Sequence, residues 1–78
     1  MLQEDQPLTG AVIIQALTTS IGRYQFMLDN GELWEQVETR RVDLREGDRV
    51  DVRPGMLNAW QMRASDGKGR SIRVRRAN

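Results

Sequence analysis

Turn-forming residues interrupt this chain at short and regular intervals. The breaks fall at residues 20–22, 30–31, 46–47, 54–55 and 66–69, and each of them contains glycine. Turn signals spaced roughly 8–12 residues apart, with apolar stretches between them, are typical of a small all-β domain. No segment has a convincing helical period. The spacing therefore predicts five or six short antiparallel strands.

The clearest hairpin signal is Asn30-Gly31, which suits a type I′ turn with a two-residue loop. This loop would pair Met27 with Trp34. One face of the hairpin would then carry an apolar set that we interpret as core: Tyr24, Phe26, Leu28, Leu33 and Val37. Trp34 would lie on the opposite, mixed face, where it is partly exposed.

A second hairpin is predicted around residues 66–68, Asp-Gly-Lys. If this triplet is the loop, Met62 pairs with Ile72 and Trp60 with Val74, which gives a coherent apolar face. A slip of one residue would exchange the two faces of the strand, so this register is favoured. The opposite face then carries arginines: Arg63, Arg73 and Arg75.

Two further stretches complete the predicted sheet. Residues 48–53 alternate, with Val50 and Val52 pointing inward. Residues 9–17 are apolar on both faces through residues 12–14, as expected for a strand that is covered on both sides. We expect residues 1–8 to be a flexible tail and residues 9–78 to form a single antiparallel barrel, either oligonucleotide-binding-like (OB-like) or SH3-like. Closure of such a barrel removes exposed strand edges.

The composition excludes most catalytic chemistry. A chain of 78 residues buries only roughly 60–65% of the surface exposed by its unfolded form, which leaves little room for a deep cleft. Cysteine and histidine are both absent, so disulfides, thiolate nucleophiles, imidazole bases and the usual zinc sites are excluded. We expect a binding module with no catalytic residues, no metal site and no cofactor.

Charge is distributed unevenly along the chain. The formal net charge is +1, but residues 1–39 hold one base and six acids, whereas residues 40–78 hold eleven bases and five acids. Lys68 is the single lysine among the twelve bases. Arginine makes planar, bidentate contacts with phosphate or carboxylate groups. A codon bias toward arginine would equally explain the excess.

The basic residues and Trp34 define three candidate sites. The first is a nucleic-acid or anion-binding surface formed by Arg63, Lys68, Arg70, Arg73, Arg75 and Arg76, for which the alternative is a solvated face whose arginines pair with Asp51 or Glu35. The second is Trp34, as a stacking or interface aromatic or as a core residue. The third is the pair Arg40-Arg41, which either extends a basic edge or lies in a solvated loop.

Two resemblances bear on function. The segments 26–36 (FMLDNGELWEQ), 47–50 (GDRV) and 72–76 (IRVRR) resemble those of a family of small, uncharacterised proteobacterial proteins, whose members often carry secretion signals. The order of 10–12 (GAV), 28–31 (LDNG), 47–50 and an arginine-rich final strand is similar to that of bacterial translation initiation factor one, an OB-fold RNA binder. This chain differs from that factor in having few lysines and no histidine.

Two functions follow as expectations. The first is binding of single-stranded nucleic acid, RNA in particular, through the arginines and Trp34. The alternative is a secreted or periplasmic envelope protein that docks onto a protein partner. The start of the chain is acidic and polar, so the sequence as it stands predicts a cytoplasmic protein, or a periplasmic one if Met1 replaces a removed signal peptide. We find no apolar window long enough for a membrane span, and the oligomeric state is left open.

Overall fold

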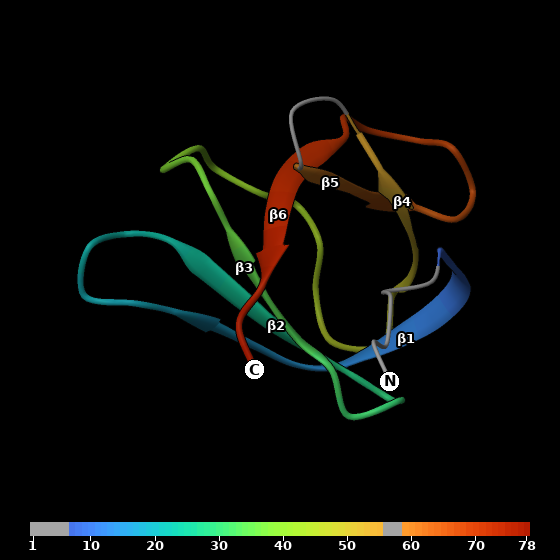
Figure 1. The fold of residues 1–78 in the computed structure, drawn as a ribbon, viewed down its shortest axis with the longest axis horizontal. Helices are drawn as coiled ribbons and strands as arrows, with labels where there is room; N and C mark the ends of the chain where they lie inside the picture. The colour runs from blue at the N-terminus through green and yellow to red at the C-terminus, as the bar shows by residue number, and fades with distance from the viewer. Residues whose placement is uncertain (1–6, 56–58) are drawn as a thin grey trace, which may run out of the picture.

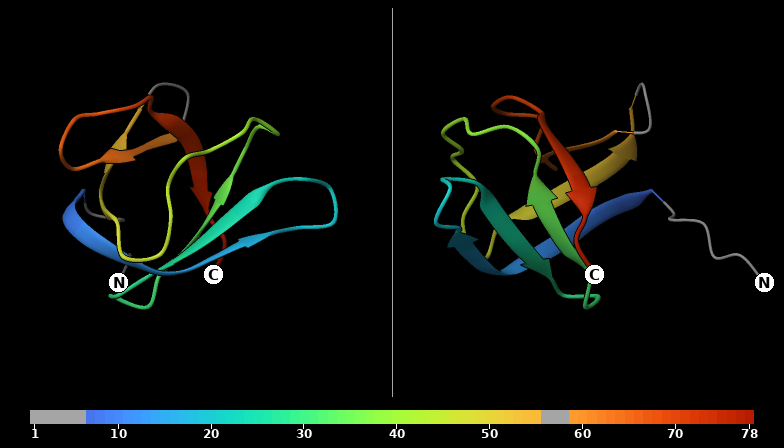
Figure 2. Two further views of the ribbon diagram at one scale, coloured as in Figure 1. Left: turned by 180° about the vertical axis from the view of Figure 1, so that it is seen from behind. Right: turned by 60° about the vertical axis from the view of Figure 1, so that its left-hand side comes forward.

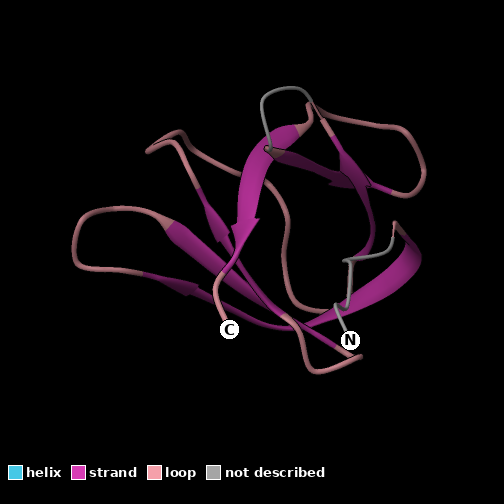
Figure 3. Cartoon of the chain, viewed as in Figure 1, coloured by secondary structure: helices cyan, strands magenta, loops and turns pink. Residues whose placement is uncertain are grey.

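Six strands form a closed antiparallel barrel in the computed structural model, which describes residues 7–55 and 59–78 (Figure 1). The strands are β1 (Leu8–Thr18), β2 (Tyr24–Leu28), β3 (Leu33–Gln36), β4 (Arg49–Pro54), β5 (Trp60–Ala64) and β6 (Ile72–Arg76). Their order around the barrel is β1-β2-β3-β6-β5-β4, and the remaining described residues are loops (Figure 3). The predicted all-β barrel is confirmed, and it is consistent with the small OB-like and SH3-like barrels. Of the predicted tail, residues 1–6 lie outside the described residues, and Leu8 already belongs to β1.

The long strand β1 closes the barrel, because it pairs with both β2 and β4. Its pairing with β4 shifts near Gly10, which has a φ of 71°. Its pairing with β2 shifts between Ile13 and Gln15, so Ile14 is the extra residue of a bulge. Ile14 is consequently 55% exposed. The expectation that residues 12–14 are covered on both faces is wrong at this position.

The core draws on all six strands and on one loop. Its buried apolar residues are Ala11, Ile13, Phe26, Leu28, Trp34, Val42, Val50, Val52, Met62, Ile72 and Val74. Val42 comes from the β3–β4 loop, residues 37–48, which crosses in front of the strands when the barrel is seen from behind (Figure 2, left). Buried Gln36 holds this loop in place, because its Nε2 donates to the Arg40 carbonyl at 2.8 Å. The loop therefore covers one end of the barrel.

The β2–β3 hairpin differs in register from the prediction by one residue. Its loop has three residues, since the amide of Gly31 donates to the Leu28 carbonyl and the amide of Leu28 donates to the Glu32 carbonyl, both at 2.9 Å. A turn followed by a glycine with positive φ, here 88° at Gly31, is the usual form of such a loop. Trp34 therefore pairs with Phe26 and not with Met27. Every side chain of β3 changes face as a result.

The β5–β6 hairpin has the predicted register. Trp60 pairs with Val74 and Met62 with Ile72. The connection is longer than the predicted triplet, because it extends over residues 65–71. In the neighbouring strand β4, Val50 and Val52 are fully buried, as the alternation predicts. The arginines between these apolar positions consequently point out of the barrel.

Candidate nucleic-acid interface

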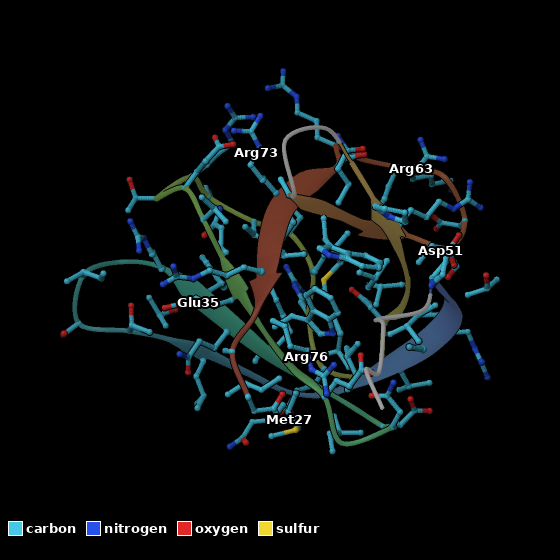
Figure 4. All side chains as sticks on the ribbon, in the orientation of Figure 1. Met27, Glu35, Asp51, Arg63, Arg73 and Arg76 are labelled. Atoms are coloured by element: carbon cyan, nitrogen blue, oxygen red, sulfur yellow. The ribbon has the colours of Figure 1, made fainter. Side chains whose placement is uncertain are left out.

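The outer surface of β4, β5 and β6 carries a row of polar side chains. Gln61 of β5 pairs with Arg73 on one side and with Arg53 of β4 on the other. Neighbouring strands lie roughly 4.8 Å apart, so the backbones of Arg53 and Arg73 are about 10 Å apart. These side chains are exposed, and Figure 4 shows Arg63 and Arg73 directed away from the barrel. We refer to Arg53, Arg63, Arg73 and Arg75 as the arginine face.

Arg53 was not among the predicted site residues, although the alternation of β4 already placed it outward. Its signal was therefore present in the sequence. What the sequence lacked was the pairing of β4 with β5, which brings Arg53 beside the hairpin. Within the described residues, neither Arg63 nor Arg73 forms an ion pair within 4.0 Å.

One carboxylate, Asp51, lies among these arginines. It is the cross-strand partner of Arg63, and its Oδ2 lies 3.9 Å from the guanidinium of Arg53. Its Oδ1 accepts hydrogen bonds from the hydroxyl of Ser65 at 2.7 Å and from the amide of Gly10 at 2.9 Å. The hydrogen bond from Ser65, then that from Gly10, and then the charges of Arg53 and Arg63 lower the pKa of Asp51. Asp51 is therefore an ionised anchor between β1 and β4.

The second carboxylate belongs to the edge of the arginine face. Glu35 of β3 pairs with Arg75 of β6, and its Oε1 accepts hydrogen bonds from Nη2 of Arg75 at 3.1 Å and from Nε at 3.3 Å. The ion pair that we considered as the alternative for this surface is present at this position. Arg75 consequently contributes less uncompensated charge than Arg63 or Arg73.

The other predicted basic residues lie at the two ends of the hairpin. Arg76 lies at the end of β6, where it contacts Glu32 at 3.5 Å and Asn78 at 3.1 Å (Figure 4). Lys68 and Arg70 lie at the opposite end, in the β5–β6 loop. The structure thus brings Arg63, Arg73 and Arg75 together, places Lys68 and Arg70 beyond one end of them, and leaves Arg76 apart.

Trp34 cannot act as the predicted stacking or interface aromatic. Its side chain is fully buried, with its ring centroid 5.5 Å from that of Trp60 and its Nε1 donating to Glu32 Oε1 at 3.0 Å. The stacking role is wrong and the core alternative for Trp34 is confirmed, because the three-residue loop turns β3 over. Tyr24 and Trp60 are half-buried against the core, so none of the aromatic rings in the described residues is exposed.

A cleft that the sequence analysis did not identify lies between two loops. It has a volume of about 540 Å³ and is lined by residues of the β3–β4 loop and of the β5–β6 loop. Four of its lining residues are cationic: Arg40, Arg41, Lys68 and Arg70. Its apolar lining comes from Val42, Leu44, Ala64 and Ile72. We refer to this hollow as the end cleft.

Comparisons with protein-family models, with curated proteins and with solved structures found no match to this chain. Within residues 7–55 and 59–78, no cluster of three or more Asp, Glu, His or Cys side chains could hold a metal ion. The same residues contain no helix with the length and apolarity needed to cross a membrane.

Proposed function

We propose that this barrel is a non-catalytic module that binds single-stranded nucleic acid through its arginine face, with RNA as the form to test first. The observation that carries this proposal is the exposed row across β4, β5 and β6. In that row Arg53 and Arg73 flank Gln61, and Arg63 lies two residue pairs further along β5, at the next outward-facing position.

Phosphate groups suit this surface chemically. A guanidinium group donates two parallel hydrogen bonds to a phosphate, and such charge-assisted bonds are the stronger class of hydrogen bond. Counterions released from the nucleic acid would supply most of the driving force. Asp51 offsets part of the positive charge of the arginine face. Its Oδ1 is occupied by hydrogen bonds from Gly10 and Ser65.

The burial of the aromatic rings changes the expected mode of binding. Base stacking on a protein ring contributes roughly 1–3 kcal/mol per base in many single-strand binders, and the described residues offer no exposed ring. Binding should therefore depend on phosphates, tolerate different sequences and weaken steeply with salt. Proteins that read a duplex through its major groove normally insert a helix or a β-ribbon. These arginines instead lie on the outer face of the barrel.

Charge-reversal variants test the assigned surface. Arg63→Glu with Arg73→Glu should weaken binding of a fluorescently labelled RNA decamer by more than tenfold in anisotropy titrations, since each reversal removes about one phosphate contact and adds repulsion. Arg73→Glu alone is compared with Arg45→Glu, a matched control in the β3–β4 loop that is exposed and lies outside the arginine face. Equal affinities of these two single variants would contradict the assignment.

A second candidate function is docking onto another protein, as the resemblance to envelope proteins suggests. The burial of Trp34 removes the anchor that the sequence analysis gave to this function. A different observation now favours it: Ile14, Leu17 and Ile21 are 55%, 51% and 63% exposed, respectively. Docking cannot use an unpaired strand edge, because the closed barrel leaves none among its described strands. If the chain docks onto a protein partner through these residues, Leu17→Ser with Ile21→Ser should abolish the association with that partner, measured by sedimentation. The same variant should leave RNA affinity unchanged.

A further inference from the structure

The end cleft has the size and the lining of a small-ligand site. Pockets for such ligands usually have volumes of roughly 300–1,000 Å³, with an apolar lining and a few polar groups. Arg40 and Arg41 come from one wall, and Lys68 and Arg70 from the other. Cations on both sides of an apolar hollow suit a ligand with an anionic group and a flat apolar part.

Three carboxylates also line the end cleft, and two of them are already used by their own loops. Asp48 Oδ2 accepts a hydrogen bond from the amide of Arg45 at 2.9 Å, and Asp66 Oδ1 accepts one from the amide of Lys68 at 2.8 Å. Arg40 is paired with Glu38 at 3.2 Å. Among the described residues, no carboxylate forms an ion pair with the other three cations of the cleft: Arg41, Lys68 and Arg70. These three are therefore the side chains available to an anionic ligand.

The end cleft adjoins the arginine face at the loop end of the β5–β6 hairpin. Arg63 and Ser71 line a hollow of about 150 Å³ on the arginine face, together with Asp51. The residues next to them in the chain, Ala64 and Arg70, line the end cleft. Consecutive Cα atoms are 3.8 Å apart. A nucleic-acid strand bound to the arginine face could therefore continue over the β5–β6 loop into the cleft.

We infer that the end cleft receives one nucleotide of the bound strand. Its phosphate would lie between Arg41 and the pair Lys68 and Arg70, and its base would cover the apolar lining. Asp43, the remaining carboxylate of the lining, is an acceptor of the kind that contacts exocyclic amino groups of bases. This inference rests on the proposed function and assigns to the cleft the base contact that the arginine face cannot make.

Amide shifts in ¹H–¹⁵N spectra of the full chain test this inference, with adenosine 5′-monophosphate, adenosine, inorganic phosphate and an RNA decamer as separate probes. The expected result is that the monophosphate and the decamer both shift amides of residues 42–44 and 68–70. Adenosine and phosphate alone should shift them far less. Arg41→Ala with Arg70→Ala should weaken monophosphate binding about tenfold, because charge-assisted hydrogen bonds are lost. Arg45→Ala, a control outside the lining of the end cleft and outside the arginine face, should leave it unchanged.

The contrary outcomes separate this inference from the proposed function. If the decamer shifts only the arginine face, the cleft does not hold a nucleotide of the strand, and the proposed function still stands. If phosphate alone reproduces the shifts, the cleft is an anion site and the base assignment is wrong. If the decamer shifts neither surface, the proposed function itself fails. The spectra also report whether each variant is folded.

Discussion

The two hairpins β2–β3 and β5–β6 follow the same alternating pattern, yet the side chains that they direct outward differ in charge. In β5–β6 the apolar positions point inward as predicted, and the outward positions are arginines. In β2–β3 the three-residue loop turns Trp34 and Gln36 inward, and the outward Glu35 neutralises Arg75. The comparison teaches that loop length decides which side chains a hairpin offers to a partner. Both hairpins contribute to the core, and in the part of the chain that the structure describes β5–β6 alone of the two supplies arginines without an ion-pair partner.

The largest expected effect tests the inward position of Trp34. Trp34→Ala should cost about 3–5 kcal/mol of unfolding free energy, the usual cost of emptying a buried tryptophan site. A domain of this size rarely has more than roughly 3–5 kcal/mol from its core, so the variant should be largely unfolded. Urea denaturation followed by circular dichroism measures this effect. Leu33→Ala, at the half-buried position next to it, is the control and should cost much less. A larger loss at Leu33 would support the predicted two-residue loop, in which Leu33 is the core residue.

Paired glycine substitutions compare the two loops. Gly31 has a φ of 88° and Gly67 a φ of 80°, and an added Cβ meets no atom within 4 Å at either site. Gly31→Ala and Gly67→Ala should therefore each cost about 1–2 kcal/mol, from backbone strain alone. Thermal unfolding of the two variants measures this cost. Unchanged stability in one of them would mean that its loop does not have the conformation described.

The role of Asp51 has a signature in pH. Because its pKa is lowered from 3.8 in the folded state, Asp51 adds stability above that value and loses the contribution as the pH falls further. Asp51→Asn should cost about 1 kcal/mol at neutral pH. The difference from the original chain should disappear in urea titrations performed well below pH 3.8. A difference that persists there would show that the carboxylate charge is not what stabilises this position.

The smallest expected effect tests the neutralised edge of the arginine face. Glu35→Gln removes the charge that faces Arg75 at 3.1 Å and keeps the size of the side chain. RNA binding should become about twofold to threefold tighter, and its salt dependence should become steeper by up to one phosphate contact. Anisotropy titrations measure both quantities. Weaker binding would mean that Glu35 orients Arg75 rather than competing for it.

The sequence predicted those elements whose register depends on alternation alone. Strand β4 and the β5–β6 hairpin follow from the positions of Val50, Val52, Met62 and Val74. The β2–β3 register could not be predicted in the same way, because Asn30-Gly31 suits both a two-residue and a three-residue loop. Both registers place apolar residues inside, and only packing against Trp60 and Phe26 separates them.

The candidate site was predictable in part for the same reason. The outward positions of Arg63, Arg73 and Arg75 followed from one hairpin. The end cleft depends on how the β3–β4 loop folds against the barrel, which is fixed by buried Val42 and by the hydrogen bond from Gln36. Neither contact has a periodic signal in the sequence. Arg40 and Arg41 could therefore be singled out, but not placed beside Lys68 and Arg70.

The most direct test of the central claim is the salt dependence of RNA binding by the unaltered chain. Anisotropy of a labelled mixed-sequence decamer is titrated at about 50 and about 200 mM salt. If three arginines contact phosphates, the affinity should fall roughly 20-fold between these conditions, from the slope for single-stranded nucleic acid. No binding at the lower salt concentration, or equal affinity at both, would contradict the assignment of the arginine face to nucleic acid.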